Sequence, residues 1–383
     1  MSISIYSFLT ALLWCNLFIA ISVILRRVNG FVLQYRIVPL LTLMLVAAIR
    51  VCCSFEFPFA HEISSYKILP AIYNFFSMEL FSLPNGAPIP VYWVFIAVWC
   101  IVSLVLLARL IYEYISFNKR IGRCAETHDP KVEDVLDKII DKTKRKKVRV
   151  IQAPNIDVPM IVGIFQITII LPNYEMSGTD LENFIRHEWN HHCHKDNMVK
   201  LLINIICCIF WWNPFFYLLR FNLDQALEIN CDMRVTGDMS EKERREYLGG
   251  ILRVLKKKES SRGKIPVSAT GLVSAKNAGQ LKQRFNIVLN NEQTKKTSKI
   301  SSILLTIMML AALTFSFLFV IQAAGDAPAY DEEGNAIFAA NTETSYLIKK
   351  NDGTYEIYIN GEYAGDTDNI YEEPLSTFAI REY

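Results

Sequence analysis

The sequence predicts an α-helical membrane protein that carries one α+β domain between its third and fourth membrane spans. Apolar residues make up 52% of the 383 residues. Four long, nearly uncharged apolar runs stand out, at residues 5–25, 38–53, 91–112 and 303–323. Each run approaches the roughly 20 residues that an α-helix needs to cross the hydrocarbon core of a bilayer. The lipid bilayer is therefore the first expected partner.

These runs divide the chain into four parts. We expect a membrane region with three transmembrane helices (1–116), a polar domain (117–300), a fourth transmembrane helix (301–323) and a short acidic tail (324–383). The polar part is long enough for one domain. The first run lacks the basic leader of a signal peptide and is longer than a signal-peptide core, so we expect it to be retained as a span.

Basic residues near the spans predict the sidedness of the chain. Arg26, Arg27 and Arg36 lie in the short loop between the first two spans, and such loops are enriched in Lys and Arg on the cytoplasmic side. The N-terminus and the tail are then outside, and the domain is cytoplasmic. The tail agrees, with 13 acidic and three basic residues after residue 324. We interpret the basic run 142–147 as a solvated helix end near the inner leaflet, and we expect no direct nucleic-acid binding.

Three short segments are typical of β-structure. Residues 148–151 and the β-branched run 167–170 predict a small sheet within the domain. In the tail, the turn signals Asn351-Asp352-Gly353 and Asn360-Gly361 flank the alternating segment 354–359. This pattern predicts a small β-hairpin or meander outside the membrane.

The strongest chemical motif is His187-Glu188-Trp189-Asn190-His191. It lies on a helix predicted at about residues 181–195, which follows the candidate capping residues Ser177, Thr179 and Asp180. Two histidines four positions apart share one helix face and can bind a single Zn²⁺, and the intervening glutamate can act as the base for an attacking water. We therefore expect one zinc ion per chain, with His187 and His191 as ligands and Glu188 as the catalytic base. Incidental histidines on a polar helix face are the simpler alternative.

A catalytic zinc site needs a third protein ligand and an open position. The best candidate downstream is Glu228, because Asp232 follows one helical turn later and could accept the free ring N–H of a ligand histidine. Asp196 and Asp224 are alternatives that lack this paired arrangement.

The third ligand constrains the apolar run 201–219, which could be read as a fifth span. Glu228 can reach His187 and His191 only from the same side of the membrane, so this run cannot be a single full crossing. The sequence Asn213-Pro214 within it agrees, because proline interrupts a continuous helix.

Together these motifs resemble the BlaR/MecR-type regulatory membrane metallopeptidases. The resemblance covers residues 1–323 and rests on His187-Glu188-x-x-His191, Asp196, Trp211-Trp212-Asn213-Pro214, Glu228-x-x-Cys231-Asp232, Pro159-x-x-x-Gly163 and Ile170-Leu171-Pro172. It implies a gluzincin-like fold, with the zinc ligands and the base proposed above. It also implies that residues 163–170 form an edge strand on which substrate backbone adds, with Gly163, Ile164, Phe165, Ile167 and Ile169 in contact with the substrate.

The resemblance further implies a biological role. Similar proteins transduce an outside signal by cleaving themselves and a winged-helix transcriptional repressor in the cytoplasm. The β-lactam sensors of this family carry a penicillin-binding domain after the fourth span, whereas only 59 residues follow Ala324 here, without an S-x-x-K motif. We therefore expect no acylation by β-lactams, and the signal is open.

Two other functions remain open at this point, and a homodimer is a possible assembly. One is a membrane quality-control zinc protease of the HtpX or CaaX-prenyl-protease kind, which also combines HExxH with a later carboxylate pair. The other is a non-enzymatic membrane receptor with a structural zinc site. Glu188 argues against the receptor, because a structural site needs no base.

Overall fold

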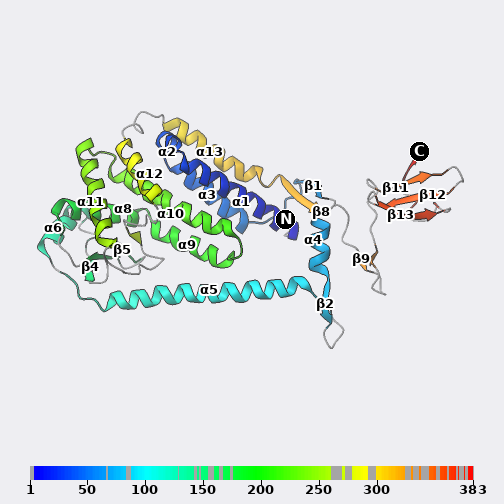
Figure 1. Cartoon of the computed structure of the whole chain (residues 1–383), viewed down its shortest axis with the longest axis horizontal. Coiled ribbons are helices and arrows are strands. Elements are labelled where there is room, and N and C mark those ends of the chain that lie inside the picture. Colours follow the sequence, from blue (N-terminus) through cyan, green and yellow to red (C-terminus); the bar gives the residue numbers. More distant parts are fainter. Residues whose placement is uncertain are drawn as a thin grey trace. The chain divides into compact units, whose positions relative to one another are not determined.

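The computed structural model describes residues 4–382 with internal gaps. The residues outside the description are 66–67, 83–87, 128, 142–144, 146–147, 154–158, 164–166, 173–175, 260–269, 272–277, 292–298, 324–328, 331–335, 338–344, 351–353, 360–361, 368–369, 371–374 and 376–377. The chain forms two units, one made of residues 1–12, 53–98 and 315–383 and the other of residues 13–52 and 99–314. Figure 1 labels their elements.

Within the described part of the chain, two helices are long and apolar enough to cross a membrane. They are α1 (Ile5–Arg27) and α5 (Val91–Gly122), which correspond to the first and third predicted spans. The second span is instead a bent pair, α2 (Asn29–Tyr35) and α3 (Val38–Cys52), whose axes differ by 100°. The backbone at Arg36 explains the break, since its φ of 63° lies in the left-handed region and ends α2.

The fourth predicted helix, residues 301–323, is confirmed as a helix up to Phe315 and is wrong beyond it. Helix α13 (Lys299–Phe315) has 17 residues, and a strand, β8 (Phe319–Ala323), follows it. β8 pairs in parallel with β1 (His61–Ser65), and the Ile321 N–H donates to the Thr10 hydroxyl at 3.0 Å. The apolar run therefore changes from helix to strand because Phe319, Val320 and Ile321 favour a strand and find a strand partner far away in the sequence.

The rest of the first unit consists of short elements and a separate sheet in the tail. The short elements are α4 (Ile68–Ser77), β2 (Glu79–Ser82), β3 (Pro88–Pro90), β9 (Ala329–Tyr330) and β10 (Ala336–Ile337). The tail sheet has the order β13-β12-β11-β14, formed by β11 (Tyr346–Lys349), β12 (Tyr355–Ile359), β13 (Glu362–Thr367) and β14 (Ala379–Glu382). β11, β12 and β13 pair antiparallel in succession, which confirms the predicted meander.

The domain contains a four-stranded sheet with the order β4-β6-β5-β7. Its strands are β4 (Val148–Ala153), β5 (Met160–Val162), β6 (Ile167–Pro172) and β7 (Thr270–Gly271). β6 pairs in parallel with β4 on one side and antiparallel with β5 on the other. The expectation that residues 163–170 form an edge strand is therefore wrong for Ile167 and Ile169, which lie in a central strand.

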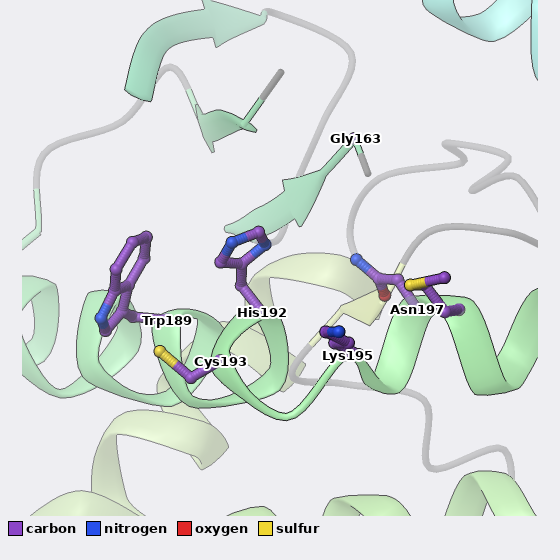
Figure 2. A pocket seen from close by; sticks show the side chains of 7 residues that line it. Gly163, Trp189, His192, Cys193, Lys195 and Asn197 are labelled. Atoms are coloured by element: carbon purple, nitrogen blue, oxygen red, sulfur yellow. The ribbon is translucent and has the colours of Figure 1, made fainter. Parts of the chain in front are cut away.

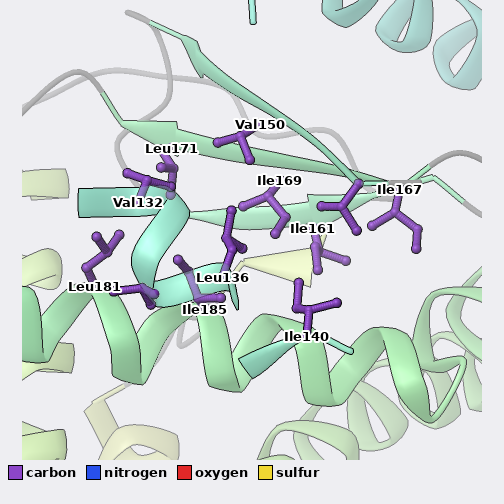
Figure 3. Close-up of a cluster of buried hydrophobic side chains, with 12 residues drawn as sticks. Val132, Leu136, Ile140, Val150, Ile161, Ile167, Ile169, Leu171, Leu181 and Ile185 are labelled. Atoms are coloured by element: carbon purple, nitrogen blue, oxygen red, sulfur yellow. The ribbon is translucent and has the colours of Figure 1, made fainter. Parts of the chain in front are cut away.

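The reason for this placement is burial on both faces of β6. Ile167, Ile169 and Leu171 pack with α6 (Pro130–Ile139) and α8 (Gly178–Cys193), as Figure 3 shows. Ile170 points to the opposite face, where it packs with residues at the end of α5. A strand covered on both faces reads as a continuous apolar run, which is the pattern of a central strand rather than of a solvated edge.

Four further helices complete the domain: α9 (Asp196–Ile209), α10 (Pro214–Val235), α11 (Glu241–Glu259) and α12 (Ala278–Leu289). The run 201–219 is divided between α9 and α10, as predicted, and neither helix is a candidate membrane span within the described chain. Asn213 caps α10 by accepting from the Phe215 N–H at 3.0 Å, and Pro214 occupies the first turn, where its missing N–H costs no bond.

Candidate metal centre

Helices α8 and α10 bring the predicted metal ligands together in the interior of the domain. Ser177 begins α8 by accepting a hydrogen bond from the Asp180 N–H at 3.1 Å, which confirms one of the candidate caps. The side chains of His187 and His191 then point inward and are fully buried. Glu228 of α10 is equally buried beside them, with a relative exposure of 1%.

The ring nitrogens of the two histidines converge on the Glu228 carboxylate. The Nε2 atoms of His187 and His191 lie 3.1 Å apart. Glu228 Oε2 is 3.6 Å from Nε2 of His187, and Oε1 is 3.6 Å from Nε2 of His191. Two imidazoles and a carboxylate that meet in this way form the donor set of a His₂Glu zinc site.

The outer hydrogen bonds leave both Nε2 atoms free of protons. Nδ1 of His191 lies 2.6 Å from the Asp196 carboxylate, which can only accept, so Nδ1 carries the proton. Nδ1 of His187 lies 2.8 Å from the Tyr247 hydroxyl, which donates its own proton to Asp232 at 2.7 Å and therefore accepts from the imidazole. The two unprotonated Nε2 atoms direct their lone pairs at one another, an arrangement that a bound cation would relieve. The residues present therefore fit a zinc ion.

Cys231 is an alternative to Glu228 as the third ligand, because its thiol lies close to both histidines. Its position, however, is behind His187. The sulfur is 3.4 Å from Nδ1 and 3.3 Å from the backbone oxygen of His187, on the ring edge opposite Nε2. Burial and the carboxylates nearby also raise the pKa of Cys231 well above its usual value, which disfavours the thiolate that binds metal. Glu228 is the better third ligand.

Two buried cations flank Glu228. Lys200 Nζ is 3.4 Å from Oε1, and an Arg284 guanidinium nitrogen is 3.4 Å from Oε2. Burial alone would raise the pKa of Glu228, but Lys200, His191 and Arg284 together hold it well below its usual range. Burial lowers the pKa of His187, which keeps this imidazole neutral. Both groups are therefore in the protonation states that metal ligation requires.

The predicted base, Glu188, lies next to the predicted metal ligands, and only one of its two carboxylate oxygens has a hydrogen-bond partner among the described residues. Its Oε2 accepts from the Ile161 N–H of β5 at 3.0 Å. Its Oε1 is buried and has no hydrogen-bond partner among the described residues. Burial and the charge of Glu228 raise its pKa well above the usual carboxyl value. A buried carboxylate with one free oxygen and a raised pKa has the properties of a general base.

A pocket of about 290 Å³ opens beside this site, at the end of β5. Figure 2 shows Trp189 and His192 extending from α8 towards Gly163, which follows β5. The two rings stack with their centroids 5.2 Å apart, and Gly163 has a φ of 97°. Asn197 holds β5 from the other side of the pocket by donating to the Ile161 carbonyl at 3.3 Å. Of the predicted substrate contacts, Gly163 lines this pocket, whereas Ile164 and Phe165 lie outside the described residues.

The sequence did not single out three residues that complete the site. Tyr247 and Arg284 lie on α11 and α12, and both contact Asp232, to which Arg284 Nε donates at 2.7 Å. Asp232 therefore reaches His187 mainly through Tyr247, since its own oxygen is 3.5 Å from Nδ1. The third residue that the sequence did not single out is Lys200, which contacts Glu228. Asp196, considered only as an alternative ligand, orients His191 instead.

Comparison with known proteins agrees with the geometry. Residues 8–288 match the family described as BlaR1 peptidase M56. The chain is 25% identical over 240 residues to the methicillin resistance mecR1 proteins of Staphylococcus aureus and Staphylococcus epidermidis, which covers 61% of this chain and 38% of theirs. It is 22% identical over 222 residues to the regulatory protein BlaR1 of Bacillus licheniformis, covering 57% of this chain and 36% of that protein.

The chain thus aligns with less than two fifths of the length of these curated relatives. The match to the family, in contrast, covers most of this chain, from the first membrane helix to α12. It includes every residue of the metal centre described above. The chain therefore belongs to the BlaR1 peptidase M56 family and is a BlaR/MecR-type membrane protein.

Proposed function

We propose that this protein is a membrane zinc endopeptidase that transduces an extracellular signal by cleaving a cytoplasmic transcriptional repressor. The observation that carries the proposal is the free, buried Oε1 of Glu188 beside the convergent Nε2 atoms of His187 and His191. A metal site that served only to stabilise the fold would not need an unsatisfied carboxylate at this position, because such a group costs free energy.

The chemistry is the addition of water to a peptide carbonyl. Zinc, held by His187, His191 and Glu228, would polarise the scissile carbonyl and make water more acidic. Glu188 would take a proton from the attacking water and return it to the leaving amine, so that the C–N bond breaks and a carboxylic acid and an amine are formed. The Ile161 N–H fixes the carboxylate for this role through Oε2.

The substrate backbone would add to β5 rather than to β6. β5 lies directly against Glu188, and its outer side pairs antiparallel with the two residues of β7. A segment of the chain itself thus occupies the edge to which an extended substrate would bind, which supports self-cleavage within the stretch around Thr270 and Gly271. A repressor segment would use the same edge, with one side chain in the pocket between Trp189 and Gly163.

A regulatory role is better supported than quality control. The relatives carry the names methicillin resistance protein and regulatory protein. The winged-helix repressor as substrate is what the resemblance to the BlaR/MecR-type metallopeptidases implies, and we propose it on that ground. The proposed topology has four spans, α1, α2 with α3, α5 and α13, with the domain in the cytoplasm. Arg26 and Arg27 at the end of α1 support this orientation, and reporter fusions after residues 60, 240 and 383 would test it.

The test of the proposed function is cleavage by a Glu188→Gln variant. Wild type and variant are co-expressed with a tagged winged-helix repressor from the same genome. Both the repressor and the chain are followed by immunoblot and by mass spectrometry of new termini. We expect cleavage by wild type and none by Glu188→Gln, with zinc retained in both. Glu182→Gln on the same helix is the matched control and should cleave normally. Cleavage by Glu188→Gln would show that the assigned base is wrong.

A further inference from the structure

Two neighbouring residues of α12, Gln283 and Arg284, contact different parts of the molecule. Arg284 is 1% exposed and binds Asp232 with two nitrogens, Nε at 2.7 Å and a terminal nitrogen at 2.9 Å. A third nitrogen lies 3.4 Å from the proposed zinc ligand Glu228. Arg284 therefore holds both carboxylates of α10 that face the metal site, and a planar guanidinium can do this where an ammonium cannot.

Gln283 faces the C-terminal end of the first membrane helix, α1. Its amide nitrogen donates to the backbone oxygen of Arg26 at 2.7 Å and to the Asn29 side chain at 3.0 Å. Its amide oxygen accepts from the Arg26 guanidinium at 2.9 Å. Two of these hydrogen bonds join the residue before Arg284 to Arg26 at the end of α1, and the third joins it to the start of α2.

Arg26 also binds α10 directly. Its Nε donates to the side-chain oxygen of Asn222, whose amide nitrogen donates to the Ser22 hydroxyl at 3.0 Å. Arg26 is 4% exposed and Asn222 is fully buried. Asn222 lies on the same helix as Glu228 and Asp232, so the contacts close a ring that runs from α1 to α10, from α10 through Arg284 to α12, and from α12 through Gln283 back to α1.

We propose that Arg284 is a positioning residue for the zinc site and that the ring through Gln283, Arg26 and Asn222 couples the position of the first membrane helix to the ligand Glu228 and its neighbour Asp232. Apart from the half-buried Gln283, the ring consists of buried polar and charged groups, which are costly to separate without replacement partners. A displacement of α1 would therefore move α12 and α10 with it or break these bonds. In either case the two carboxylates held by Arg284 would change their position relative to His187 and His191.

This inference rests on the proposed zinc site, and zinc affinity is its readout. The full chain, purified in lipid nanodiscs, is titrated with zinc against a chelator of known affinity. Arg26→Gln should weaken zinc binding severalfold, which is less than the roughly 10–100-fold loss that is typical when a direct partner of a ligand is removed, because Arg26 acts through Gln283 and Asn222. Arg27→Gln is the matched control, because Arg27 is exposed at the same helix end, and it should bind zinc like wild type.

A double-mutant cycle separates coupling from general destabilisation. Gln283→Ala should weaken zinc binding to a similar degree, whereas Lys282→Ala, at the exposed neighbouring position, should not. The variant with both Arg26→Gln and Gln283→Ala should be no weaker than either single variant, because both changes interrupt the same ring. Additive losses, or a wild-type affinity in both single variants, would overturn the coupling.

Amide hydrogen exchange gives an independent reading, because coupling between two sites is reciprocal. Zinc should slow exchange at residues 22–35 in wild type and should have no such effect in Arg26→Gln. Equal slowing in both proteins would contradict the proposal. A wild-type chain that binds no zinc would instead refute the metal site itself, so the two failures are distinguishable.

Discussion

The hydroxyl of Tyr247 lies 2.8 Å from Nδ1 of His187 and donates its proton to Asp232 at 2.7 Å. This relay fixes the imidazole with its proton on Nδ1 and with Nε2 free to bind metal. Such outer partners orient a ligand histidine and increase its basicity.

Removal of the Tyr247 hydroxyl should therefore weaken metal binding and leave the fold intact. Tyr247→Phe keeps the ring that packs in the core beside Phe184 and Leu248. We expect zinc affinity to fall about tenfold, measured by chelator competition. Tyr363→Phe, in the tail sheet, is the control for loss of a tyrosine hydroxyl. An unchanged affinity in Tyr247→Phe would mean that Asp232 alone suffices to orient His187.

Gly163 should be sensitive to any side chain because its φ is 97°. Gly163→Ala would strain the backbone by about 1 kcal/mol and displace the end of β5, next to the pocket formed with Trp189 and His192. We expect a larger loss of peptide cleavage than of thermal stability. The comparison is Gly178→Ala at the start of α8, where an added Cβ meets no atom within 4 Å. Equal activity of the two variants would exclude Gly163 from the substrate site.

The stability of the first turn of α8, the helix that carries His187 and His191, should depend on the Ser177 hydroxyl. Ser177 accepts from the Asp180 N–H, whereas the neighbouring Thr179 is exposed and provides no cap. Ser177→Ala should therefore lower the free energy of unfolding by about 1 kcal/mol, and Thr179→Ala should change it by less than about 0.5 kcal/mol. Chemical denaturation in detergent measures both. A larger effect at Thr179 would mean that the helix begins differently in solution.

Much of the centre of this molecule could be predicted from local patterns. The HExxH spacing places two histidines on one helix face, and the spacing from Glu228 to Asp232 does the same for two carboxylates. A proline after asparagine marks the start of α10. Each of these signals acts within one or two helical turns, so a single sequence is enough to read it.

The remaining features depend on contacts between distant segments. Tyr247 and Arg284 meet Asp232 from helices that begin later in the chain, and no local pattern distinguishes them from other tyrosines and arginines. Similarly, β8 forms because β1 is available to pair with it. The placement of β6 is different, because its sequence, apolar except for the β-branched Thr168, already indicated burial on both faces. The edge-strand interpretation overlooked that signal.

The most direct test of the metal centre is zinc K-edge X-ray absorption on the purified, zinc-loaded chain. With His187, His191 and Glu228 as protein ligands, the first shell should contain only nitrogen and oxygen, at about 2.0–2.2 Å. The same spectrum is expected for Cys231→Ser, whereas Glu228→Gln should lose most of its zinc. A sulfur scatterer at about 2.3 Å that disappears in Cys231→Ser would contradict the account, because Cys231 would then hold the metal in place of Glu228.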